Sequence, residues 1–132
     1  PVQKPDETVW TGKFPWPARG DILESFVAET NQGINIAVPE GTDIKAVEKG
    51  IVIYAGDGLK ALGTTVLVRH EGSLVTVYGH LGEIEVRRGQ EVRRGEKIGK
   101  SGKSGEARRA QLHFEVRKNA APVDPAKYLS AP

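Results

Sequence analysis

The stretch of sequence best suited to chemistry runs from residue 111 to residue 117, where polar and apolar residues alternate without interruption. This alternation is typical of a half-buried β-strand, in which successive side chains point to opposite faces. The predicted core-facing set is Leu112, Phe114 and Val116, and the predicted polar set is Gln111, His113, Glu115 and Arg117. A histidine on a rigid polar face is well placed for catalysis or binding, although an exposed strand with a solvated histidine is the simpler interpretation.

Two earlier segments extend the pattern, Asn31-Gln32-Gly33-Ile34-Asn35 and Tyr78-Gly79-His80-Leu81. With the 111–117 stretch, they resemble the three ordered motifs of the lysostaphin-like zinc metallopeptidases, the LytM or M23 family. Those motifs are His-x-x-x-Asp, Tyr-x-His-Leu and His-Leu-His-Phe-Glu. The resemblance covers about residues 14–130 and includes framework residues at 38–42, 50–52 and 123–125. It implies the fold of that family.

The departures from the motifs predict that the hydrolytic site is degenerate. The resemblance places the zinc ligands at Asn31, Asn35 and His113, but asparagine offers neither an imidazole nitrogen nor an anionic oxygen, and a catalytic zinc needs three protein ligands. The resemblance also places the two general acid/base residues at His80 and Gln111. Glutamine cannot exchange a proton near neutral pH, whereas histidine can. We therefore expect no catalytic residue, no bound metal and no cofactor.

Degenerate members of this family imply a function that does not require catalysis. They activate cell-wall amidases in the bacterial envelope during cell division and daughter-cell separation. By resemblance, we expect an N-acetylmuramoyl-L-alanine amidase as protein partner and a location in the periplasm or envelope of a Gram-negative bacterium. The alternatives are a peptidoglycan-binding module and, less favoured, an active zinc endopeptidase.

The groove left by a lost hydrolytic site is the predicted partner-binding surface, because its concavity can still receive a segment of another protein. Tyrosine and arginine are frequent binding hot spots, and arginines near the last strand are suited to steer an acidic partner. The candidate groove residues are Tyr78, His80, Arg108, Arg109, Gln111, His113 and Arg117.

Length and composition predict one domain without a membrane span. The chain has 132 residues, of which 38% are hydrophobic, and no apolar run approaches the roughly 20 residues of a transmembrane helix. Cysteine is absent, so disulfides and thiolate metal sites are excluded. We predict a linker over residues 1–17 and a degenerate LytM/M23-like domain over 18–132, with Trp10, Phe14 and Trp16 fixing the end of the linker to the fold. The start at Pro1 predicts a piece of a longer protein.

The element pattern predicts a mostly β fold, a twisted antiparallel sheet or sandwich. Turn signals recur every few residues among 16 glycines and eight prolines. The clearest strands, Thr64–His70 and Ser73–Gly79, flank a Glu71-Gly72 hairpin turn; shorter ones are expected at Ile34–Val38, Asp43–Val47 and Ile51–Ala55. A Val-Arg-Arg-Gly sequence at 86–89 recurs at 92–95 and predicts two consecutive β-turn units. A biotinyl or lipoyl carrier fold, with Lys49 as its modified lysine, is the competing resemblance.

Charge is distributed unevenly despite a net charge of only +2. Residues 1–48 carry four basic and eight acidic residues, whereas residues 87–109 carry nine basic and three acidic residues. The basic stretch is either a solvated loop face or a surface that attracts an acidic partner. It contains no aromatic residue on which bases could stack, so we do not expect nucleic acid as a partner.

Overall fold

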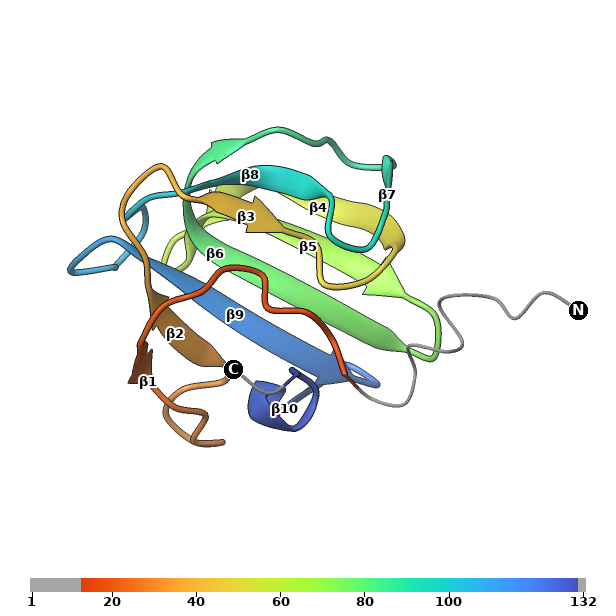
Figure 1. The fold of residues 1–132 in the computed structure, drawn as a ribbon, viewed down its shortest axis with the longest axis horizontal. Helices are drawn as coiled ribbons and strands as arrows, with labels where there is room; N and C mark the ends of the chain where they lie inside the picture. The colour runs from red at the N-terminus through yellow and green to blue at the C-terminus, as the bar shows by residue number, and fades with distance from the viewer. Residues whose placement is uncertain (1–12, 131–132) are drawn as a thin grey trace, which may run out of the picture.

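The computed structural model describes residues 13–130, which form one continuous antiparallel sheet that curls into a sandwich-like body (Figure 1). The strands are β1 (Ile22–Glu24), β2 (Ile34–Ala37), β3 (Asp43–Lys45), β4 (Gly50–Leu59), β5 (Gly63–His70), β6 (Leu74–Ile84), β7 (Glu91–Val92), β8 (Lys97–Ser101), β9 (Gln111–Lys118) and β10 (Ala121–Val123). The single helical turn of the described residues is the 3-10 helix η1 (Pro125–Lys127). The predicted mostly β, antiparallel fold class is confirmed.

Strand β6 organises the sheet. The main path runs β1-β2-β9-β6-β5-β4-β7, and β8 pairs with both β6 and β3 while β10 pairs with β9. Over its first half β6 lies between β5 and β9, and from Leu81 onward it pairs with β8 instead of β9. This change of partner lets β3 and β8 fold over one end of the long strands, as Figure 1 shows.

The hydrophobic core joins the long strands to the short strands above them. Ile44 of β3 and Ile98 of β8 belong to the same buried cluster as Ile36, Leu112 and Phe114. Val116 is buried as well, so the predicted core-facing set of the last motif is confirmed. At about 25 cal/mol per Å² of apolar surface, burying side chains of this size supplies most of the driving force for folding.

The first described residues already pack against the domain. Phe14 is fully buried, and its backbone forms a parallel bridge with Leu129. The indole Nε1 of Trp16 donates a hydrogen bond to the Ser130 carbonyl at 2.9 Å. Packed contacts therefore begin four residues before the boundary predicted at residue 18. Trp10, the third aromatic of that prediction, lies outside the described residues.

The five predicted strands overlap β2 to β6, although β4 and β6 extend to Leu59 and Ile84, beyond the predicted ends at Ala55 and Gly79. The β5–β6 hairpin turns at Glu71-Gly72, where Gly72 has φ +79°. The two Val-Arg-Arg-Gly sequences form matching turns: in each, the backbone N–H three residues after the first arginine donates to the carbonyl of that arginine. Lys49 precedes β4 and is not at a hairpin tip, so the carrier-domain interpretation is wrong. No helix within residues 13–130 has the length and apolar character needed to cross a membrane.

Candidate functional site

The strand register brings the three motifs together. In the β2–β9 pair Asn35 lies opposite His113, and in the β6–β9 pair Gly79 lies opposite the same histidine. His80 follows Gly79, and its ring centroid is 6.0 Å from that of His113. The positions that the sequence predicted to share a degenerate active site therefore do lie side by side.

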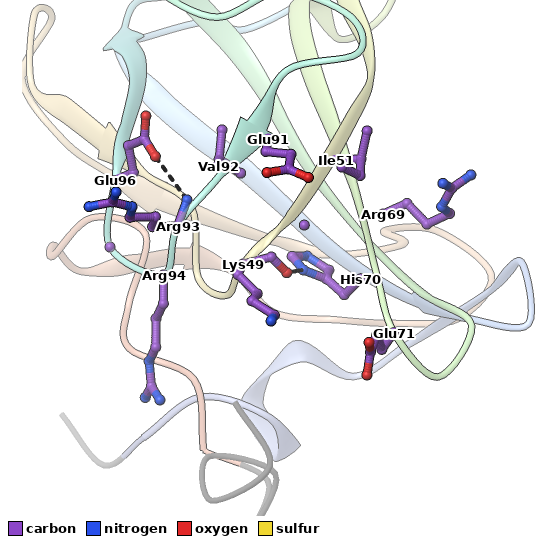
Figure 2. A pocket seen from close by; sticks show the side chains of 12 residues that line it. Lys49, Ile51, Arg69, His70, Glu71, Glu91, Val92, Arg93, Arg94 and Glu96 are labelled. Atoms are coloured by element: carbon purple, nitrogen blue, oxygen red, sulfur yellow. Dashed lines mark hydrogen bonds between the residues drawn. The ribbon is translucent and has the colours of Figure 1, made fainter. Parts of the chain in front are cut away.

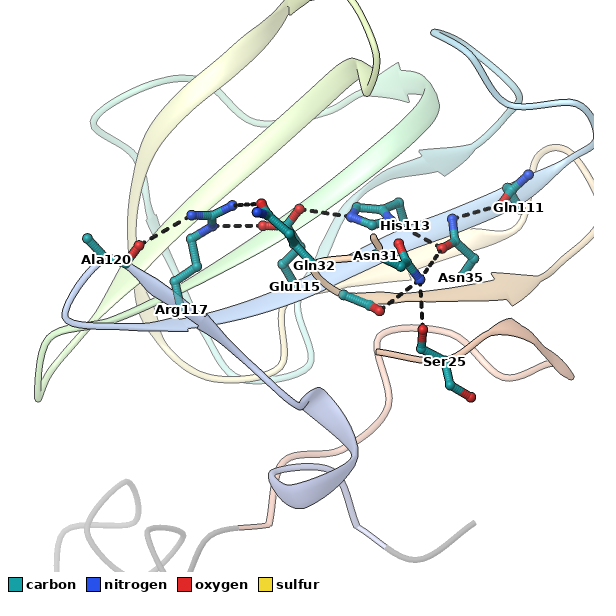
Figure 3. A network of polar contacts seen from close by, with 10 residues as sticks. Ser25, Asn31, Gln32, Asn35, Gln111, His113, Glu115, Arg117 and Ala120 are labelled. Carbon is teal, nitrogen blue, oxygen red and sulfur yellow. Dashed lines mark hydrogen bonds and ion pairs between the residues drawn. The ribbon is translucent and has the colours of Figure 1, made fainter. Parts of the chain in front are cut away.

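The amide side chains of the site are hydrogen-bonded to one another. Asn31 Nδ2 donates to Asn35 Oδ1 at 3.1 Å, and Asn35 Nδ2 donates to Gln111 Oε1 at 2.8 Å (Figure 3). Asn35 and Gln111 are buried, so each amide depends on its neighbour to satisfy its polar atoms. Because Asn35 uses its oxygen for one partner and its nitrogen for the other, the orientation of its amide is fixed.

The network continues along β9 through an ionic segment. His113 Nδ1 lies 3.4 Å from Asn35 Oδ1, and His113 Nε2 donates to Glu115 Oε2 at 2.8 Å. Glu115 Oε1 accepts from Arg117 Nε at 2.7 Å, and Arg117 Nη2 donates to Gln32 at 2.9 Å. Burial raises the pKa of Glu115, but the hydrogen bonds from His113 and Arg117 outweigh burial and leave that pKa below 4.5.

His80 occupies the point at which β6 changes partner. Its φ is 62°, an uncommon value for a residue other than glycine, and its N–H donates to the Leu62 carbonyl at 2.7 Å. Its ring Nδ1 donates to the Ser104 carbonyl at 2.8 Å, so the neutral ring presents Nε2 as an acceptor. Burial lowers the pKa of His80 below 6.5, which favours this neutral form.

A groove of about 540 Å³ opens over part of this site. Asn35, His80 and Gln111 form its floor, and the remaining lining residues are Leu23, Glu24, Glu106, Ala107, Arg108 and Arg109. We call this feature, with these nine lining residues, the polar groove. Strand β1 supplies one wall and the loop between β8 and β9 supplies the other.

Comparison with known proteins places this geometry in a family. Residues 29–125 match the family model described as Peptidase family M23. The chain belongs to peptidase family M23. It is 41% identical to cell division protein DipM of Caulobacter vibrioides over 128 residues, covering 89% of this chain and 21% of DipM. It is 37% identical to the murein hydrolase activator NlpD of Escherichia coli over 116 residues, covering 86% of this chain and 30% of NlpD.

A solved M23 structure confirms the fold of this M23 domain. The crystal structure described as a peptidase M23 from Pseudomonas aeruginosa superposes with a TM-score of 0.84 at 37% sequence identity. The match covers 92% of this chain and 52% of the other. The part of DipM that matches this chain is about a fifth of the length of DipM, and the matching part of NlpD is about a third of the length of NlpD.

The donor set of this M23 domain does not fit a catalytic zinc. Of the three positions that the sequence resemblance assigns to zinc ligands, Asn31 and Asn35 carry neutral amides, and the Asn35 oxygen already accepts a hydrogen bond from the Asn31 amide. His113 is held between Asn35 Oδ1 and the Glu115 carboxylate. Among residues 13–130 no cluster of three histidine, cysteine or acidic side chains could hold a metal ion. The residues present supply one suitable ligand where three are needed.

Three residues predicted to line the groove lie elsewhere. Tyr78 is fully buried: its hydroxyl accepts from the Val47 N–H and lies 2.8 Å from the Thr76 hydroxyl, and its ring packs 5.5 Å from that of Phe114. Burial raises the pKa of Tyr78 to about 12. His113 and Arg117 are absent from the groove lining, and their polar atoms contact Asn35 and Glu115. His80, Arg108, Arg109 and Gln111 line the polar groove.

The wall formed by Leu23 and Glu24 was missed by the sequence analysis. These residues belong to a strand of three residues, too short for alternation to be visible. The signal that could have found them is an Ile-Leu pair inside an acidic stretch.

A second, larger cleft lies away from the motif residues. Its volume is about 1060 Å³, and charged residues of both signs line it, including Lys49, Arg69, Glu71 and Glu91 (Figure 2). His70 lies at its base, with its Nδ1 donating to the Lys49 carbonyl at 2.8 Å. None of the degenerate active-site positions lines this cleft.

Proposed function

We propose that this M23 domain is a non-catalytic activator of bacterial cell-wall amidases that works by protein–protein contact through the polar groove. The partner is an N-acetylmuramoyl-L-alanine amidase, the setting is daughter-cell separation, and the location is the periplasm or envelope of a Gram-negative bacterium. The names of two relatives, a murein hydrolase activator and a cell division protein, support this role.

The observation that carries the proposal is the amide network at the old catalytic centre. Asn35 donates to Gln111 and accepts from Asn31, so three positions that a hydrolase needs for zinc and proton transfer instead satisfy one another. Without three zinc ligands the site has no means of lowering the pKa of an attacking water toward neutrality. A site of this kind binds but does not hydrolyse.

The polar groove supports the binding part of the proposal. Its floor offers the His80 ring and the Gln111 amide, while Arg108 and Arg109 are exposed at its rim. Exposed arginines beside a concave surface steer and orient an incoming partner, whereas buried polar groups give specificity.

Dye release from labelled peptidoglycan tests this function. A candidate amidase is assayed alone and with the domain, and the domain is assayed alone with added zinc. Activation predicts no release by the domain alone and several-fold faster release by the amidase when the domain is present. Release by the domain alone that chelation abolishes would instead identify a peptidase.

Peptidoglycan binding is the second candidate function, because the arginines at the groove rim also suit the carboxylates of peptidoglycan stem peptides. Co-sedimentation of the domain with purified sacculi measures it. Retention on sacculi without stimulation of any amidase would favour this candidate over activation.

A further inference from the structure

The polar groove has one large apolar lining residue, Leu23 on the β1 wall, and two further exposed hydrophobic residues lie close to it in the sequence. Four large hydrophobic side chains of the described residues are prominently exposed, and Ile22, Leu23 and Val27 lie together in and just after β1. Their exposed fractions are 41%, 37% and 48%, and Leu23 lines the groove. β1 is an edge strand, so within the described chain nothing pairs with its outer side.

The chain segment that includes β1 is acidic, and its Glu24 lines the groove. Residues 21–29 contain Asp21, Glu24 and Glu29, and the sequence has no lysine or arginine between residues 20 and 44. All three acidic residues are exposed. The β1 wall therefore combines exposed apolar surface with negative charge.

The facing wall is basic. Residues 103–109 contain Lys103, Arg108 and Arg109 against the single acidic residue Glu106, and these four side chains are exposed. Arg108 and Arg109 take part in none of the ion pairs found among the described residues. Their charge is thus available to an incoming group.

The two walls stand on opposite sides of the floor. β1 pairs with β2 at the outer edge of the sheet, which is on one side of β9. The loop of residues 103–109 forms hydrogen bonds to elements on the other side of β9. Ser104 accepts a hydrogen bond from the His80 ring on β6, and the Glu106 N–H donates to the Ala61 carbonyl at the β4–β5 turn. The order β1-β2-β9-β6 therefore separates an acidic, apolar wall from a basic wall.

We propose that the polar groove binds a protein segment with one apolar, basic edge and one acidic edge, in a single orientation. Leu23 and Glu24 of the domain contact the apolar, basic edge of the segment. Arg108 and Arg109 contact its acidic edge. The identification of this segment as part of an amidase rests on the proposed function. Opposite charges on the two walls penalise the reversed orientation, because it brings like charges together on both sides.

A polysaccharide or an anionic cell-wall peptide fits this surface less well. Carboxylates suit the basic wall but are repelled by Glu24, and a sugar chain has no aliphatic side chain to cover the exposed Leu23. The chemistry of both walls together favours a folded or extended segment of protein.

Fluorescence anisotropy with three synthetic peptides tests the proposal. Each labelled 18-residue peptide has the same leucine stripe, flanked by lysines on one side and glutamates on the other, by lysines on both sides, or by glutamates on both sides. At 0.15 M salt the wild-type domain should bind the mixed peptide at least about three-fold more tightly than either uniform peptide.

Charge reversal on one wall should change the preferred peptide. Glu24→Arg makes both walls basic and should make the all-glutamate peptide the tightest ligand; Arg108→Glu should favour the all-lysine peptide. Glu71→Arg and Arg88→Glu make the same changes in net charge at exposed positions outside the groove, and they should preserve the preference for the mixed peptide. Leu23→Ser should weaken binding of all three peptides, whereas Leu59→Ser should not.

The outcomes separate this inference from the proposed function. Equal binding of the three peptides by the wild-type domain, no binding of any of them, or the same ranking in Glu24→Arg and Arg108→Glu, would overturn it. So would Glu24→Arg increasing retention on purified sacculi while leaving amidase stimulation unchanged. If the ranking reverses as expected but the domain stimulates no amidase, the surface stands and the activator function fails.

Discussion

Replacing Arg117 with alanine is expected to destabilise the domain by about 2 kcal/mol, because it leaves a buried carboxylate short of one partner. Arg117 Nε lies 2.7 Å from Glu115 Oε1, and the Glu115 side chain is only 6% exposed. Breaking a fully buried pair costs roughly 3–5 kcal/mol. Because the Arg117 side chain is 29% exposed and His113 still donates to Glu115, the expected cost lies below that range, at about 2 kcal/mol.

The cost should depend on pH in a direction fixed by Glu115. In the wild-type domain the pKa of Glu115 lies below 4.5, so its contribution to stability is present above pH 4.5 and is lost as pH falls through the folded pKa. Without Arg117 that pKa rises. The stability deficit of Arg117→Ala relative to wild type should therefore be largest near pH 7 and shrink below about pH 4.5.

Urea denaturation at pH 7 and pH 4 measures both effects, with Glu115→Gln as the companion change. Glu115→Gln combined with Arg117→Ala should be more stable than Arg117→Ala alone, because a neutral amide replaces the stranded charge. A loss below about 0.5 kcal/mol for Arg117→Ala, the typical effect of an ordinary surface substitution, would show that the Arg117–Glu115 pair does not stabilise the domain as expected. The same conclusion would follow if Arg117→Ala reduced the free energy of unfolding equally in the wild-type domain and in the Glu115→Gln variant.

Three further outcomes follow from the structure. Tyr78→Phe should cost about 1–3 kcal/mol in chemical denaturation, because it leaves the buried Val47 N–H without its acceptor. Burial lowers the pKa of His70 despite the hydrogen bond to the Lys49 carbonyl, so the free energy of unfolding should decline as pH falls below 6.5. His70→Gln should make this decline smaller, which thermal melts at several pH values measure. Metal analysis should find far less than one equivalent of zinc, and combining Asn31→His with Asn35→Asp should raise it.

The strands were predictable because their side-chain alternation is long. The β5–β6 hairpin was located almost to the residue, since Glu71-Gly72 separates two runs with a period of two. The facing side chains of Asn35 and His113 were expected from the order of the motifs, and the strand register places them opposite each other.

The orientation of central strands was not predictable from alternation. In β6 the residues Thr76, Val77 and Tyr78 are all buried, because this part of the strand is covered on both faces. An alternation with a period of two indicates which side chains share a face of the strand, but it does not indicate which of the two faces borders the groove. Tyr78 was therefore assigned to the groove, although its side chain lies in the core. The Glu115–Arg117 pair, by contrast, joins residues on the same face and two apart, a spacing visible in the sequence.

A bulky side chain placed in the polar groove should block activation if the amidase binds there. Ala107 lines the groove and is half-buried, so Ala107→Trp places a bulky ring in it. Ala121→Trp adds the same ring at an exposed position on β10, away from the groove. In the dye-release assay with a responsive amidase, Ala107→Trp should abolish most of the stimulation while Ala121→Trp stimulates as well as the wild-type domain. Full stimulation by a folded Ala107→Trp domain would contradict activation through this groove.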